Sequence, residues 1–411
     1  MAATPSPSIT ADADPQAHVA RRNIRLLFTA QALGGSAPPI IISLGGIVGQ
    51  QLAGDPALAT LPVSLYYLGL AMFTIPAALL ARRLGRRLSY AGGAALSIVA
   101  GLVAAYGIVS GQFLMFCLST LLAGYYGACV QNYRFAASDS VTAPERPKAI
   151  ARIMAGGLVA AVIGPQVVIW TRDAWPGAPF AGSFLGMTAL ALLAMPILLS
   201  LHTPPPAAAA VHEDAQTRSL WEIAGNPRFA VAAIAGIISY GLMSFVMTAA
   251  PMAMVHHGHS VGEAALGIQW HVLAMYGPSF FTGHLITRFG KITITTLGLL
   301  MIAAAAALAL TGLGLFHFWG MLILLGLGWN FGFIGATALV TDTYRPAERG
   351  KVQALNDFLI FGTVAIASFS SGQLLNAAGW GRINGLILPV IAAVLVLLAW
   401  LALSNRRSAR A

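Results

Sequence analysis

Two short polar clusters interrupt the long apolar segments of this sequence. Gln131, Asn132 and Arg134 form one cluster, and Gln269 and His271 flank Trp270 in the other. Ionisable groups inside an apolar segment are costly to bury, so they mark candidate sites for a bound solute or ion. Arg134 can attract an anionic or carbonyl-bearing molecule, or it can extend to the nearer aqueous surface. His271 can titrate near neutral pH, or it can serve as a hydrogen-bonded contact between helices.

The sequence gives little sign of a metal site, an enzyme active site or a nucleotide-binding loop. His256, His257 and His259 stand close together, but Glu263 is the one carboxylate that could support a metal there, so we expect no metal site. No nucleophile, base and orienting group stand together, which argues against an enzyme. No Gly-rich phosphate loop followed by Lys-Ser/Thr occurs, and we expect no cofactor.

A charged motif with the pattern D-x5-E-R-x-K-x-x-A occurs twice, half a chain apart. Its first copy holds Asp139, Glu145, Arg146 and Lys148, and its second holds Asp342, Glu348, Arg349 and Lys351. A second echo lies at nearly the same offset, with Arg83-Leu-Gly85-Arg86 repeated as Arg288-Phe-Gly290-Lys291. A period of half the chain is too long for a solenoid and is typical of a membrane protein built by duplication.

The amino-acid composition indicates that the long apolar segments lie in a membrane. Charged residues make up 9% of the chain and hydrophobic residues 57%, whereas a globular domain has about 25% charged residues. Apolar stretches long enough to cross a bilayer as helices lie near 24–49, 59–81, 88–109, 113–137, 150–170, 181–201, 229–251, 264–286, 292–314, 318–340, 352–375 and 383–403. We therefore predict an all-α membrane protein with 12 transmembrane helices in two pseudo-symmetric six-helix halves.

The basic residues give the orientation. With this span count, all of the 23 Lys and Arg residues except Arg172 and Arg382 fall on one side, which the positive-inside bias assigns to the cytoplasm. The net charge of +10 thus reflects orientation rather than nucleic-acid binding. The expected parts are a disordered cytoplasmic tail (1–20), an N-terminal half (21–201), a cytoplasmic linker (202–227), a C-terminal half (228–404) and a basic cytoplasmic tail (405–411).

The spans and loops resemble the major facilitator superfamily over nearly the whole chain. That family's loop motif after span two runs roughly G-x-L-a-D-r-x-G-r-r. The corresponding stretches here are Ala78-Leu-Leu80-Ala81-Arg82-Arg83-Leu84-Gly85-Arg86-Arg87 and Gly283-His-Leu285-Ile-Thr287-Arg288-Phe-Gly290-Lys291. The family's Asp is replaced by Arg82 in one copy and by Thr287 in the other.

The resemblance implies a substrate cavity at mid-depth between the halves, lined by spans one, four, seven and ten. Tyr125 and Tyr126 lie about 20 Å along span four from Asp139, and Trp329 and Asn330 match them in span ten. The predicted cavity residues are Gln31, Tyr125, Tyr126, Gln131, Asn132, Arg134, Tyr240, Ser244, Gln269, His271, Trp329 and Asn330. The alternative for the aromatic residues is packing between helices or in an interfacial belt.

The resemblance also implies a cytoplasmic gate that rearranges as the halves rock. In the family the loop Asp faces a helix start in the opposite half, and span eleven here begins with Asp357. We hypothesise a reversed latch in which Arg82 or Arg83 pairs with Asp357 in the outward-facing state. The predicted gate residues are Arg82, Arg83, Gly85, Arg86, Asp139, Glu145, Arg146, Arg288, Gly290, Asp342, Glu348, Arg349 and Asp357; for the charged loops the alternative is solvated surface charge.

These observations predict a secondary transporter of a small organic molecule in a bacterial inner membrane, working by alternating access. The expected partners are that substrate, the lipid bilayer and a coupling ion, the proton, with His271 or Asp357 as its carrier; no nucleic acid is expected. Uptake of a planar polar nutrient such as a vitamin or an organic acid and efflux of drugs or metabolites both remain open. A non-transporting membrane sensor on the same fold is the remote alternative.

Overall fold

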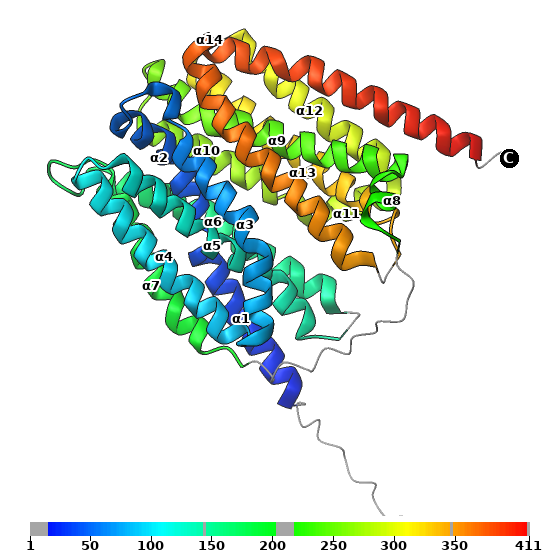
Figure 1. Ribbon diagram of the computed structural model, residues 1–411, viewed down its shortest axis with the longest axis horizontal. Coiled ribbons are helices and arrows are strands. Elements are labelled where there is room, and N and C mark those ends of the chain that lie inside the picture. Colours follow the sequence, from blue (N-terminus) through cyan, green and yellow to red (C-terminus); the bar gives the residue numbers. More distant parts are fainter. Residues whose placement is uncertain (1–14, 143–144, 203–217, 346–347, 409–411) are drawn as a thin grey trace, which may run out of the picture.

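The computed structural model describes residues 15–142, 145–202, 218–345 and 348–408, and helices are the regular structure of these ranges (Figure 1). Most of the expected amino-terminal tail, the central part of the linker and the last three residues lie outside them. The helices up to the linker are α1 (Pro15–Gly34), α2 (Ala37–Leu52), η1 (Pro56–Leu58), α3 (Leu61–Arg83), α4 (Arg86–Val109), α5 (Phe113–Asp139), α6 (Arg146–Thr171) and α7 (Ala181–Leu199). Those after it are α8 (Leu220–Ala224), α9 (Pro227–His256), α10 (Val261–Tyr276), α11 (Ser279–Phe289), α12 (Lys291–Thr311), α13 (Leu315–Val340) and α14 (Arg349–Ser408).

These helices make the twelve predicted membrane crossings. Ten stretches in the described part of the chain are long and apolar enough to span a membrane, and α1 with α2 forms one of them. α10 and α11 are each too short, but they follow one another across Gly277 and Pro278 as a single broken span. α14 counts once although it contains two spans, which meet at Gly379 with φ 75°. The predicted all-α fold is confirmed.

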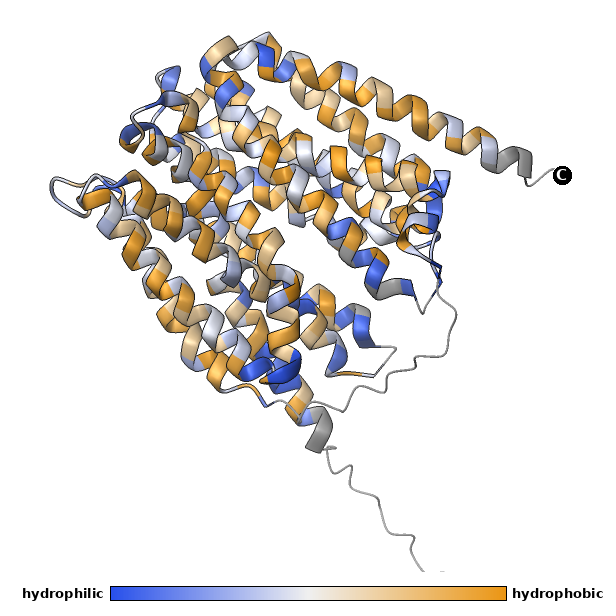
Figure 2. Ribbon diagram, in the orientation of Figure 1, coloured by the Kyte–Doolittle hydropathy of each residue, from blue (hydrophilic) through white to orange (hydrophobic). Residues whose placement is uncertain are grey.

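The helices form two bundles that lie side by side, one built from α1 to α7 and the other from α8 to α14 (Figure 1). In the first half α4 packs against α5 and α7, and α3 packs against α5; in the second half α9 packs against α14 and α12 packs against α13. Large apolar side chains such as Leu114 (77% exposed) and Phe316 (82% exposed) point outward. Hydrophobic residues run along the helices, and hydrophilic ones gather at their ends (Figure 2). This pattern is the one that a surrounding lipid phase requires.

Glycines let two helices of the first half approach at backbone distance. A Cβ added to Gly124 of α5 would lie 2.7 Å from backbone atoms of Tyr66, Gly69 and Leu70 in α3. No side chain can fit there without moving one helix. Close approach at small residues is how helices associate in a membrane, where lipid removes the hydrophobic driving force between them.

The duplicated charged motifs fold into two matching corners. We call the end of the bundles where His202 and Arg218 flank the undescribed part of the linker the linker side, and the opposite end the far side. On the linker side Arg86 forms an ion pair with Asp139, and Lys291 pairs with Asp342 at 2.6 Å. Gly85 and Gly290 begin the helices that carry the two cations, with φ of 82° and 87°. Positive φ at both positions explains why the repeat keeps glycine there.

The two copies differ at their glutamates. Glu348 is fully buried, and its two carboxylate oxygens accept hydrogen bonds from Nε (2.9 Å) and Nη2 (2.7 Å) of Arg218 at the end of the linker. It also accepts from the backbone N–H groups of Arg218 and Arg345. Glu145, its counterpart in the first half, is exposed and accepts from the Thr142 hydroxyl at 2.9 Å. The second half therefore carries an anchor for the linker, formed by Glu348 and Arg218.

The two halves hydrogen-bond to each other on the far side. The Thr60 hydroxyl donates to the carbonyl oxygen of Phe369 at 3.2 Å, and the Ser64 hydroxyl donates to the hydroxyl oxygen of Ser368 at 3.2 Å. All of these residues lie toward the far ends of their helices. The halves are thus joined away from the linker, and their contacts there are made by neutral groups.

We predict that Glu348→Gln destabilises the protein at neutral pH, and that the difference in stability between the variant and the wild type becomes smaller at acidic pH. Hydrogen bonds from Arg218, and then from the backbone of Arg345, hold the pKa of Glu348 well below its usual range. A carboxylate whose pKa is lower in the folded state than in the unfolded state stabilises the fold at any pH above its unfolded-state pKa, near 4.5. This contribution is lost as the pH falls from that value toward the folded-state pKa. Melting temperatures of detergent-purified wild type and Glu348→Gln should therefore differ at pH 7, and the difference should begin to shrink as the pH falls below about 4.5.

Glu145→Gln is the matched control, because the exposed Glu145 contacts only the Thr142 hydroxyl among the described side chains. It should melt within error of the wild type at each pH. Equal losses in the two variants would contradict the linker anchor.

Candidate functional site

The halves enclose a cavity with two connected lobes. The far-side lobe encloses about 790 Å³ of empty space and the linker-side lobe about 1080 Å³, the part open to solvent included. Both lobes are lined by Gln31, Val130, Gln131, Gly157, Tyr240 and Tyr276, so the two lobes adjoin one another. The wall comes from both halves, so a solute in this cavity would touch each of them.

An aromatic cluster forms the second-half wall. The ring of Tyr240 in α9 lies edge-on to Trp329 (5.2 Å between centroids), Phe333 (5.1 Å) and Phe361 (5.8 Å). Trp329 and Phe333, one helical turn apart on α13, stack at 5.1 Å with an interplanar angle of 18°. Edge-to-face and offset-stacked rings are the favoured geometries for such pairs. They leave flat aromatic faces for a planar ligand.

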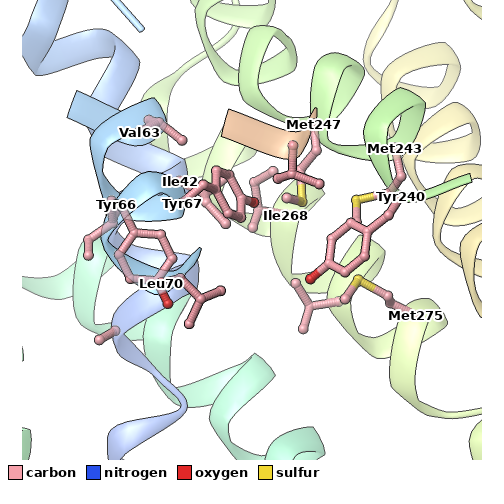
Figure 3. Close-up of a cluster of buried hydrophobic side chains, with 14 of the residues drawn as sticks. Ile42, Val63, Tyr66, Tyr67, Leu70, Tyr240, Met243, Met247, Ile268 and Met275 are labelled. Atoms are coloured by element: carbon pink, nitrogen blue, oxygen red, sulfur yellow. The ribbon is translucent and has the colours of Figure 1, made fainter. Parts of the chain in front are cut away.

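Aromatic residues of the first half face this cluster across the gap. Figure 3 shows Tyr66 and Tyr67 of α3 on one side and Tyr240, Met243 and Met275 on the other, with the Tyr240 hydroxyl directed toward the space between them. Tyr66 and Tyr67 themselves meet edge-on at 5.5 Å. Methionine side chains adapt their shape and contact aromatic rings favourably, so this lobe suits a flat apolar group.

Polar groups are sparse but available. Gln31 and Gln131 line both lobes, and Asn132 lines the linker-side lobe, where its Nδ2 donates to the Ala128 carbonyl oxygen at 2.9 Å. The Trp329 Nε1–H is buried and has no hydrogen-bond partner among the described residues. A buried donor without a partner costs free energy unless a ligand or water satisfies it, so Trp329 is a candidate ligand contact.

Two charged side chains line the cavity. Arg134 of α5 and Asp357 of α14 come from opposite halves and both border the linker-side lobe. The Arg134 guanidinium lies 4.9 Å from the Phe135 ring centroid, and its buried Nε has no partner in the described part of the chain. The sequence placed Arg134 at this cavity but assigned Asp357 to the gate.

Several predicted cavity residues lie elsewhere. Tyr125 packs edge-on against Phe73 at 5.6 Å, and Tyr126 and Ser244 are fully buried. None of the three borders either lobe. Their side chains pack against neighbouring helices instead.

Gln269 and His271 also pack between helices. Gln269 accepts a hydrogen bond from Nε2 of Gln166 at 3.1 Å, which adds a contact between the halves. His271 is fully buried, and its Nδ1 lies 2.7 Å from the carbonyl oxygen of Leu322. Neither side chain borders the lobes.

Asn330 holds the break in span eight. Its Nδ2 donates to the Met275 carbonyl oxygen and to the Ser279 hydroxyl, each at 2.7 Å, and its Oδ1 accepts from the Thr282 hydroxyl at 2.6 Å. A carbonyl freed at a helix break inside a membrane needs such a partner, since lipid offers none. Asn330 therefore contributes to the cavity indirectly, by fixing α10 against α11.

Sequence reasoning missed five aromatic residues that line the cavity: Tyr66, Tyr67, Tyr276, Phe333 and Phe361. The adjacent tyrosines in an otherwise apolar span were a usable signal. The phenylalanines gave none, because they do not stand out among lipid-facing residues.

The predicted gate residues lie on the linker side, around the ion pairs described above. Arg82 and Arg83 are exposed at the end of α3, and no ion pair joins either of them to Asp357 within the described ranges. The latch was predicted for a state closed on this side, so it stays a prediction. Arg146 and Arg288 are exposed, and the side chain of Arg349 lies outside the described part.

Twelve membrane-spanning helices in two duplicated halves around an aromatic, amide-lined cavity define a transporter of small organic molecules, not an enzyme. The chain belongs to the major facilitator superfamily, whose family model matches residues 26–359 and 232–411.

Curated relatives span nearly the whole chain. The sequence is 60% identical to the riboflavin transporter RfnT of Brucella anthropi, over 92% of this chain and 96% of that protein. It is also similar to two uncharacterized MFS-type transporters of Bacillus subtilis. YdeG is 30% identical over 92% of this chain and 93% of its own length, and YddS is 29% identical over 94% and 91%.

Proposed function

We propose that this protein takes up riboflavin across a bacterial inner membrane by alternating access, driven by the proton gradient. The observation that carries the proposal is the cavity between the halves, with the stacked Trp329 and Phe333 beside Tyr240. The 60% identity to a riboflavin transporter supports the choice of vitamin.

The chemistry of riboflavin fits this wall. Its three-ring isoalloxazine system is planar, carries two carbonyl groups and is uncharged at neutral pH, and its ribityl chain bears hydroxyl groups. Flat aromatic faces bind such a ring by stacking. Gln31, Gln131 and the unpartnered Trp329 Nε1–H offer hydrogen bonds to the carbonyl and hydroxyl oxygens.

The arrangement of the halves supports alternating access and an inward-facing state. The hydrogen bonds of Thr60, Ser64 and Gln166 join the halves on the far side, whereas the linker-side lobe reaches Phe135 and Asp357 near the helix ends. Basic residues crowd the linker side, which the positive-inside bias makes cytoplasmic. The far-side contacts must then separate to admit the vitamin from outside.

Transport of labelled riboflavin tests the function. In a riboflavin-auxotrophic bacterium without an importer, the wild type should restore growth and uptake, and Trp329→Ala should lower the initial uptake rate at limiting riboflavin about tenfold. The loss of one stacking face costs about 1–3 kcal/mol, and 1.4 kcal/mol is tenfold.

Trp170→Ala is the matched control, because Trp170 is 75% exposed on the outer surface of α6. It should transport like the wild type at equal membrane abundance. A wild type that lowers cellular riboflavin would indicate efflux, and one that moves no riboflavin in either direction would refute the proposed substrate.

Asp357 is our proposed proton carrier, since it is the one carboxylate among the described residues that borders either lobe. Coupling requires a carrier that can reach water from each side in turn, and His271 lies buried away from the cavity. In proteoliposomes with an imposed pH gradient, Asp357→Asn should abolish accumulation above equilibrium. It should retain exchange of internal for external riboflavin, which needs no net proton movement.

Asp173→Asn removes an exposed carboxylate on the far side that pairs with Arg172 and should accumulate riboflavin normally. Normal gradient-driven accumulation by Asp357→Asn would contradict the assignment of the carrier. It would leave riboflavin transport itself in place.

A further inference from the structure

Charge in the cavity is confined to one cation and one anion. Among the described residues that border the two lobes, Arg134 is the one basic side chain and Asp357 the one carboxylate; the other polar groups are amides, hydroxyls and an indole. Arg134 belongs to α5 and Asp357 to α14, so the halves contribute opposite charges to the same lobe. The lobe is therefore polar but close to zero net charge.

A space of this kind treats neutral and anionic ligands differently. An uncharged ligand can take hydrogen bonds from a guanidinium without disturbing a nearby carboxylate. A phosphate monoester carries about −1.5 to −2 charges at pH 7, which must leave water to enter the cavity. Charges in a partly buried site are weakly screened, so Asp357 repels the phosphate while Arg134 supplies a single compensating charge.

Apart from Arg134, the basic residues in the described part of the chain lie outside this lobe. Arg82 and Arg83 are exposed at the end of α3, and Arg218 is held by Glu348. Arg134 borders the same lobe as Trp329, and its buried Nε has no hydrogen-bond partner in the described residues. That donor is available to a carbonyl oxygen of a neutral heterocycle.

We propose that Arg134 and Asp357 are specificity-determining residues that make the cavity select uncharged flavins and reject phosphorylated ones. Arg134 binds the carbonyl edge of the ring, and Asp357 cancels the charge that would otherwise attract a phosphate. This inference rests on riboflavin as the substrate. It predicts that discrimination follows the net charge of the pair rather than the shape of the cavity.

Equilibrium binding tests the inference without transport. Quenching of flavin fluorescence by the detergent-purified protein gives a Kd for riboflavin and one for riboflavin 5′-phosphate at pH 7.5. The wild type should bind riboflavin at least about tenfold more tightly, which corresponds to 1.4 kcal/mol. The selectivity ratio is the Kd for riboflavin 5′-phosphate divided by the Kd for riboflavin. Asp357→Asn, with net charge +1 at the pair, should lower this ratio about tenfold. Arg134→Gln, with net charge −1, should raise the ratio.

The double variant Arg134→Gln/Asp357→Asn restores zero net charge and should restore the wild-type ratio, even with weaker binding of both flavins. Asp173→Asn changes total charge by the same amount far from the cavity and should leave the ratio unchanged. If one single variant does not fold, the other tests the same dependence with the opposite sign.

Each outcome has a separate meaning. A wild type that binds both flavins equally, or ratios that do not follow the charge of the pair, would overturn the inference and leave riboflavin binding established. A wild type that binds neither flavin would overturn the proposed function and the inference together.

Discussion

The inability of lipid to hydrogen-bond with the backbone is the constraint on which this structure depends. It forces each crossing to be a helix and requires every break within the membrane to be satisfied by the protein itself. Span eight breaks at Gly277 and Pro278, and Asn330 receives the freed carbonyl of Met275. Span one breaks at Gly35, where the Ser36 hydroxyl donates to the Ala32 carbonyl oxygen at 2.8 Å. Both breaks lie beside the cavity, which they help to shape.

The two halves repeat the same corners and ion pairs, but they differ in the residues that hold the linker and line the cavity. The corners built on Gly85 and Gly290 match, and so do their ion pairs. Glu348 buries itself against the linker while Glu145 stays exposed. The aromatic cluster around Tyr240 belongs to the second half alone. A cavity with unlike walls can grip one face of a substrate by stacking and the other by hydrogen bonds.

Sequence alone predicted the all-α fold and the order of the membrane crossings, because hydropathy and basic residues report directly on the membrane; it did not predict the breaks within spans one and eight. Of the residues that it assigned to the cavity, Gln31, Gln131, Arg134, Tyr240 and Trp329 border the linker-side lobe. The sequence did not predict how each helix is rotated about its axis, and so which of its faces points toward the cavity. A membrane helix is apolar on the faces toward lipid and toward its neighbours alike, so periodicity cannot tell them apart. Tyr126 and Asn330 were therefore assigned to the cavity but are buried among other helices.

Distances between spin labels across the two ends of the protein test the central claim, that one cavity opens to opposite sides in turn. Labels would replace the exposed Arg87 and Arg288 on the linker side, and in a second sample Gln112 and His256 on the far side, after replacement of the buried Cys117 and Cys129. Riboflavin should shift part of the linker-side distribution to shorter distances and the same fraction of the far-side distribution to longer ones. Two distributions that stay fixed, or that lengthen together, would contradict the account.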